Sequence, residues 1–187
     1  MNIPISLTLL RIVAIPFVIL FYLLPFSWAH PVAAVIFLLA GLTDWLDGYL
    51  ARALSQTTKL GAFLDPVADK LLVTMALVIV LGKGDLPFLS IPIAIIIGRE
   101  IAISALREWM AEIGKRVGVK VTYIAKVKTV VQMLAVILLL WYYPGVNPLV
   151  KWFGPILLWI AAALTLWSMG IYLRAAWPDL TLSKEKE

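Results

Sequence analysis

The chain has 187 residues, of which 63% are hydrophobic and 14% charged, with a net charge of +5 and a mean hydropathy of +0.98. Soluble domains carry about 25% charged residues and disordered chains need low hydrophobicity, so both classes are excluded. At about 20 residues per crossing, a chain of this length has room for about six membrane helices. We expect them to form a single domain that covers residues 1–187. Without cysteine, disulfides and thiolate metal sites are excluded as well.

Six apolar runs, taken in chain order, predict an all-α polytopic membrane protein with six transmembrane helices. Their approximate bounds are Leu7–Leu24, Pro31–Leu50, Leu64–Leu81, Pro87–Leu106, Val127–Tyr143 and Phe153–Leu173. The first run is interrupted by Arg11 and lacks a cleavage site, so we interpret it as a retained helix rather than a signal peptide. Pro16 predicts a kink in it. A polar tail from about residue 177 is expected to be frayed.

Positive charge is distributed unevenly between the two sides that these helices imply. The side that holds both termini collects fourteen of the 16 Lys and Arg residues, and only Lys83 and Lys151 fall on the other side. The positive-inside rule therefore places both termini in the cytoplasm. The basic excess suits anionic lipid headgroups, and no nucleic-acid partner is expected.

Four aspartates lie in or beside the apolar runs, where a charged side chain costs about 2.5–3.5 kcal/mol deep in the bilayer. Asp44 and Asp47 fall at i and i+3 of one helix, and Asp65 and Asp69 fall at i and i+4 of the next. The short link keeps the two helices adjacent, so the four carboxylates can converge near the cytoplasmic face. Their mutual repulsion and all-oxygen chemistry predict two divalent cations, Mg²⁺ or Mn²⁺.

Small and cationic residues around the aspartates suit a phosphate ligand. Gly48 and Ala51 continue the stripe of Asp44 and leave room for a ligand, as does Gly61, while Arg52 offers a planar fork to a phosphate. Carboxylates, metal and arginine together indicate a site that handles a pyrophosphate.

Separate explanations exist for single members of this set. Asp65 before Pro66 has the pattern of a helix N-cap, and Gly48 alone could serve helix packing. Asp44 and Asp47 could belong to an ion pathway. Four aspartates in this register, with a glycine and an arginine, favour the ligand site.

The segments Asp44–Arg52 and Gly61–Asp69 together have the pattern D-x2-D-G-x2-A-R-x8-G-x3-D-x3-D. This pattern resembles the signature of the CDP-alcohol phosphatidyltransferase family at all eight fixed positions. The stretches Asn2–Arg11, Gly98–Trp109 and Lys126–Gln132 are similar to the branch of the family that uses sn-glycerol 3-phosphate, although Ile5 replaces an expected polar residue.

The resemblance implies a six-helix, usually homodimeric and metal-dependent enzyme of the bacterial inner membrane. It would transfer a phosphatidyl group from CDP-diacylglycerol to sn-glycerol 3-phosphate and release CMP, with its active site on the cytoplasmic side. By family analogy Asp44 and Asp65 bridge both metals, Asp47 completes one metal site, and Asp69 binds the other metal and is the general base.

The same resemblance assigns substrate contacts. The CDP-diacylglycerol contacts are Gly48, Ala51, Arg52, Thr58 and Gly61.

For the acceptor phosphate we expect cations on the cytoplasmic side of the fourth and fifth helices. These are Arg99, Arg107, Lys126 and Lys128. Contact with lipid headgroups is the alternative for each of them. Glu100 and Glu108 are candidates for local pairing with the arginines, and His30, on the far side, has no assigned chemistry.

Two alternatives for the function stay open. The same chemistry could use inositol phosphate, serine or phosphatidylglycerol as acceptor. The second alternative is a small ion or metal transporter. Such a protein would favour carboxylates near the middle of the bilayer and an internal repeat, whereas here the carboxylates gather at one side and no repeat is evident.

Overall fold

The computed structural model describes residues 3–53, 59–86, 88–112 and 123–182, without the side chains of residues 3, 4, 44–53, 59, 62, 123–126 and 178–182. The described part contains six helices and no strand, which confirms the all-α prediction. The helices are α1 (Ile3–Leu23), α2 (Ala29–Ala53), α3 (Lys59–Lys83), α4 (Ser90–Glu112), α5 (Tyr123–Trp141) and α6 (Pro148–Leu182).

Several helices extend beyond the apolar runs that predicted them. α2 continues past its aspartates to Ala53, and α3 begins at Lys59, before its apolar run. α6 continues to Leu182. The expectation of a frayed chain from Trp177 is therefore wrong for the residues up to Leu182. Backbone hydrogen bonding needs no apolar surroundings, and Ala, Leu, Arg and Lys all favour helix at these ends.

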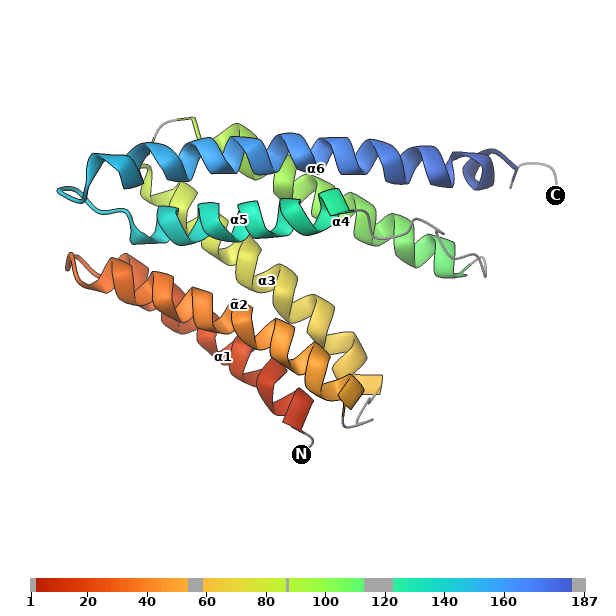
Figure 1. Cartoon of the computed structure of the whole chain (residues 1–187), viewed down its shortest axis with the longest axis horizontal. Helices are drawn as coiled ribbons and strands as arrows, with labels where there is room; N and C mark the ends of the chain where they lie inside the picture. The colour runs from red at the N-terminus through yellow and green to blue at the C-terminus, as the bar shows by residue number, and fades with distance from the viewer. Residues whose placement is uncertain (1–2, 54–58, 87, 113–122, 183–187) are drawn as a thin grey trace.

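The helices pack as two pairs joined by a crossing helix (Figure 1). α1 lies along α2, and α5 lies along α6, while α3 crosses between the pairs and α4 packs on α6. α2 also packs on α5, which connects the two pairs. The beginnings of α1, α3 and α5 and the ends of α2, α4 and α6 lie toward the same side of the molecule. This is the side on which the sequence concentrates its positive charge.

A continuous apolar core holds the pairs together. Phe37 of α2, Leu77 of α3 and Leu139 of α5 are fully buried in it, with Ile93 of α4 and Leu158 of α6. In a lipid environment, which is itself apolar, these side chains hold the helices together through close van der Waals packing.

Large apolar side chains are also exposed along the outside of every helix. Examples from successive helices are Leu20, Leu39, Val78, Ile101, Val130 and Trp167. A soluble monomer rarely exposes apolar surface on this scale, whereas a lipid-facing surface requires it.

Two stretches within the described chain are long and apolar enough to cross a bilayer, Ile5–Leu23 and Pro148–Trp177. Ala29–Thr43 and Val127–Trp141 form shorter apolar helices. The apolar helices indicate a membrane protein, and the six-span topology remains a prediction.

Gly41 marks a close approach of α2 to α5. A Cβ atom added at Gly41 would overlap the terminal methyl group of Met133. A side chain at this position would therefore push the flexible end of Met133 aside where the two helix pairs meet.

Candidate active site

Asp65 and Asp69 lie one turn apart inside α3, and Asp65 is half-buried while Asp69 is exposed. The N-cap interpretation of Asp65 is wrong, because α3 begins at Lys59 and contains Pro66 in its interior. The Asp65 carboxylate instead accepts a hydrogen bond from the Thr8 hydroxyl of α1. α1 thus fixes the orientation of one signature aspartate.

α1 brings a second polar group into the interior beside Thr8. Both Thr8 and Arg11 are fully buried, three residues apart on the same helix face. Arg11 is therefore part of the interior of the protein and not a solvated cation at the interface. A guanidinium enclosed in this way needs charged or polar partners.

The first half of the signature lies on the last turns of α2. Asp44, Asp47, Gly48, Ala51 and Arg52 are all within this helix, so the expected helical register is confirmed for the backbone. Their side chains are outside the description. Thr58 lies outside the described residues altogether, and Gly61 is buried on the first turn of α3.

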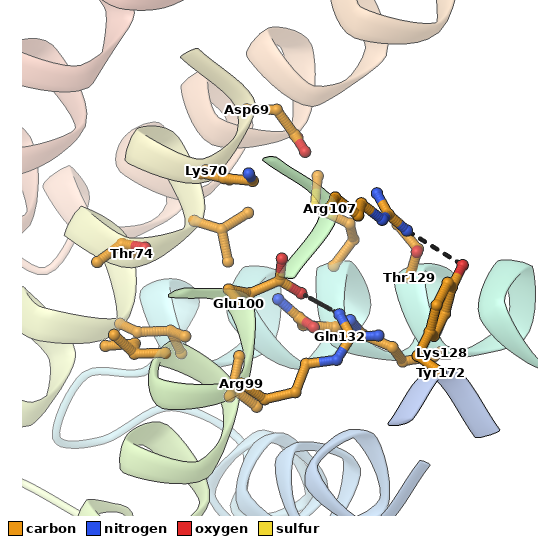
Figure 2. A pocket seen from close by; sticks show the side chains of 15 residues that line it. Asp69, Lys70, Thr74, Arg99, Glu100, Arg107, Lys128, Thr129, Gln132 and Tyr172 are labelled. Carbon is orange, nitrogen blue, oxygen red and sulfur yellow. Dashed lines mark hydrogen bonds and ion pairs between the residues drawn. The ribbon is translucent and has the colours of Figure 1, made fainter. Parts of the chain in front are cut away.

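A pocket of about 210 Å³ opens where α3, α4, α5 and α6 meet (Figure 2). Asp69 and Lys70 of α3 lie on one wall, and Arg99, Arg107 and Lys128 lie on the others. The structure therefore brings the predicted general base into one cavity with three of the four predicted acceptor cations. Lys126, the fourth, is on the first turns of α5, and its side chain is not described.

Glu100 organises the buried cations of this pocket. Its Oε1 atom accepts a hydrogen bond from Lys128 Nζ at 2.7 Å and another from Arg99 Nη1 at 2.9 Å. The side chains of Lys128 and Arg99 are only 7% and 8% exposed. The expected local pairing of Glu100 with Arg99 is confirmed, and Lys128 adds a partner from another helix.

Arg107 is held by the last helix. Its Nη2 atom donates to the Tyr172 hydroxyl of α6 at 3.1 Å, and its guanidinium carbon lies 5.1 Å from the centre of the Tyr172 ring. Arg99 and Arg107, two turns apart on α4, both face this cavity, as their spacing predicts.

The charges that line the pocket leave a cationic surplus. Lys70, Arg99, Arg107 and Lys128 stand against Asp69 and Glu100. Glu100 is already engaged by two of these cations, so the remaining positive charge can bind a phosphate dianion. Arg99 and Lys128 are buried members of this surplus, and an anionic ligand would offset the cost of burying their charge.

Sequence reasoning missed several residues that shape this pocket. Lys70 donates to the Ser104 hydroxyl and so bridges α3 to α4. Ser168 accepts a hydrogen bond from Arg99 Nη2 at 2.9 Å, and Tyr172 holds Arg107. The available signal was the recurrence of polar residues at helical spacing inside the apolar run of α6, at Thr165, Ser168 and Tyr172.

The donor chemistry of the signature suits a hard divalent cation. Asp44 and Asp47 on α2 and Asp65 and Asp69 on α3 supply only oxygen, at i, i+3 and i, i+4 spacing. Among the side chains that the structure describes, no three acidic, His or Cys residues gather as a metal-binding group. This set omits Asp44 and Asp47, which are half of the predicted ligands.

The opposite end of the molecule holds a separate polar cluster. His30 is buried, its Nδ1 atom donates to the Phe26 carbonyl at 3.3 Å, and its Nε2 atom accepts from Lys83. Lys83 also pairs with Asp85 at 3.6 Å. As expected, His30 has no place in the pocket of Asp69.

Comparison with known proteins identifies what this arrangement is similar to. Residues 1–167 match the family model described as CDP-alcohol phosphatidyltransferase. A Sodalis glossinidius protein named CDP-diacylglycerol--glycerol-3-phosphate 3-phosphatidyltransferase is 55% identical over 96% of this chain and 97% of its own length. A Yersinia enterocolitica protein of the same name is also 55% identical, and one from Salmonella choleraesuis is 53% identical, with the same coverage.

Proposed function

Because the chain belongs to the CDP-alcohol phosphatidyltransferase family, we propose that it transfers a phosphatidyl group from CDP-diacylglycerol to sn-glycerol 3-phosphate. The products are phosphatidylglycerol phosphate and CMP. Relatives that match almost the whole chain carry the name of this reaction. The observation that carries the proposal is the pocket that Asp69 shares with Arg99, Arg107 and Lys128.

The pocket supports a direct displacement. The primary hydroxyl of glycerol 3-phosphate attacks the phosphorus that bears the diacylglycerol, a new P–O bond forms, and the P–O bond to CMP breaks. The hydroxyl proton passes to the Asp69 carboxylate, and the electron pair of the broken bond leaves on the CMP phosphate. The phosphate of the acceptor and the pyrophosphate of CDP-diacylglycerol are both anionic. The rate therefore depends on how the two substrates are oriented and on how their charges are neutralised.

We assign the acceptor phosphate to the cationic side of the pocket. Arg99 and Lys128 are pre-oriented by their shared contact with Glu100, and Arg107 is pre-oriented by Tyr172. This leaves the glycerol hydroxyls directed toward α3, where Asp69 lies. We assign Lys126, which is on the same helix as Lys128, to the approach of this phosphate.

The nucleotide half of the site belongs to the ends of α2 and α3. We propose that Asp44, Asp47, Asp65 and Asp69 hold two divalent cations, Mg²⁺ or Mn²⁺, and that Gly48, Ala51, Arg52, Thr58 and Gly61 contact the CDP group. When bound, the metals supply neutralisation of the pyrophosphate and stabilise the departing CMP. Thr8 keeps the Asp65 carboxylate in a fixed orientation on α3.

We further propose the setting of the reaction. The six helices cross the bacterial inner membrane with both termini and the pocket on the cytoplasmic side, where the basic residues gather, and two copies form a homodimer. The exposed apolar surface of every helix supports a lipid environment.

The decisive experiment measures CMP release from CDP-diacylglycerol in detergent micelles with Mg²⁺ or Mn²⁺ and a panel of acceptors. We expect release with sn-glycerol 3-phosphate. Release only with inositol phosphate, serine or phosphatidylglycerol would overturn the acceptor assignment. No release with any acceptor would overturn the enzymatic proposal and reopen the transporter alternative.

A further inference from the structure

α6 carries a buried polar stripe, of which Tyr172 lines the cavity. Thr165, Ser168 and Tyr172 recur at i, i+3 and i+7 and are 0%, 4% and 7% exposed, although the helix around them is apolar. Burying a polar group costs free energy unless it is hydrogen-bonded, so a stripe of this kind needs partners. The family match ends at residue 167, before Ser168 and Tyr172.

Ser168 is oriented so that it can only accept from Arg99. Its hydroxyl donates to the Thr165 carbonyl at 2.9 Å, which uses its single proton. Its lone pairs then receive Arg99 Nη2 at 2.9 Å, while Arg99 Nη1 is bound by Glu100. Two groups on different helices therefore fix the plane of the Arg99 guanidinium.

Tyr172 restrains Arg107 in two ways. The hydroxyl accepts a hydrogen bond at 3.1 Å, and the aromatic ring lies 5.1 Å from the guanidinium carbon (Figure 2). Arg107 is itself exposed, and a free arginine side chain loses rotamer entropy when a ligand immobilises it. A tyrosine that orders Arg107 in advance removes part of this cost from binding.

We propose that Ser168 and Tyr172 are positioning residues that hold Arg99 and Arg107 for the acceptor phosphate, so that α6 sets the affinity for the acceptor. The inference rests on the proposed function and adds two residues to it. Neither side chain touches the reacting atoms, because each acts through an arginine.

The test compares hydroxyl deletions at matched positions. Tyr172→Phe keeps the ring and removes the hydrogen bond to Arg107. Ser168→Ala removes the hydrogen bond to Arg99. For each we expect the KM for sn-glycerol 3-phosphate to rise about 5–10-fold, with kcat within about twofold and the KM for CDP-diacylglycerol unchanged. Tyr143→Phe and Ser90→Ala, which remove the same groups elsewhere, should leave all constants unchanged.

A double-variant cycle separates positioning from a general structural effect. If Tyr172 acts through Arg107, then Tyr172→Phe has no further effect on KM once Arg107→Ala is present. Additive effects, a fall in kcat alone, or equal changes in the controls would overturn the inference. Should Tyr172→Phe unfold, the Ser168→Ala constants decide.

Failure of the two proposals is distinguishable in the same assay. CMP release by the wild type with an unchanged KM in both variants overturns the positioning role alone. No release by the wild type overturns the proposed function and this inference with it.

Discussion

Glu100→Gln provides a quantitative test of the buried ion network. One carboxylate oxygen accepts from Lys128 at 2.7 Å and from Arg99 at 2.9 Å. Glutamine keeps an oxygen that can accept both hydrogen bonds but removes the negative charge. Two buried cations would then face each other with no neutralising partner.

The expected loss follows from the two contacts. Hydrogen bonds to charged groups contribute about 1.5–3 kcal/mol and neutral ones about 0.5–1.5 kcal/mol, so each contact loses about 1 kcal/mol or slightly more. Because the Glu100 side chain is 27% exposed, solvent screens part of this. We expect the free energy of unfolding to fall by about 2 kcal/mol, a Tm decrease of about 4–8 °C for a chain of this size.

The assay is thermal unfolding in detergent micelles, followed by tryptophan fluorescence. Glu108→Gln is the matched control on the same helix, where the side chain is exposed, and it should leave Tm within about 1 °C. Lys128→Met added to Glu100→Gln should recover stability, because it removes a buried charge that has lost its partner. A Tm within 1 °C of wild type for Glu100→Gln, or an equal decrease in the control, would refute the reasoning.

Three predictions concern turnover, each measured as CMP release. Asp69→Asn should lower kcat at least about 100-fold without loss of folding, because the proton acceptor is gone, whereas Asp85→Asn at the opposite end should behave as wild type; comparable activity in the two variants would contradict the role of Asp69. Arg107→Ala and Lys128→Ala should raise the KM for sn-glycerol 3-phosphate about 10-fold or more, while Lys151→Ala does not; unchanged KM values would favour the lipid-headgroup interpretation. Removal of divalent cations with a chelator should abolish turnover, and added Mg²⁺ or Mn²⁺ should restore it; activity that persists in chelator would exclude the metal proposal.

The sequence predicted the helices well and their ends less well. Apolar runs of about 20 residues identify helices because the bilayer demands them, and all six are present. The predicted runs end at Leu50 and begin again at Leu64, both within the signature, whereas α2 continues to Ala53 and α3 already begins at Lys59. Polarity marks the end of a hydrophobic surface, whereas a helix ends where its backbone hydrogen bonds end.

The site could be predicted only where spacing along one helix carries the information. The i, i+4 relation of Asp65 and Asp69 and the two turns between Arg99 and Arg107 follow from helix geometry. The pairing of Glu100 with Lys128 joins α4 to α5, and no local pattern encodes it. The spacing of Ser168 and Tyr172 indicates a polar face on α6, but only the facing helix α4 shows that they contact Arg99 and Arg107.

The close approach at Gly41 connects the outside of the pocket to its shape. Gly41 lies on α2, away from the cavity, but a side chain there would displace Met133, and Met133 is part of the cavity wall. The thioether end is flexible, so the fold would absorb the change by moving Met133. A single methyl group on α2 would therefore reshape the wall of a pocket that it does not touch.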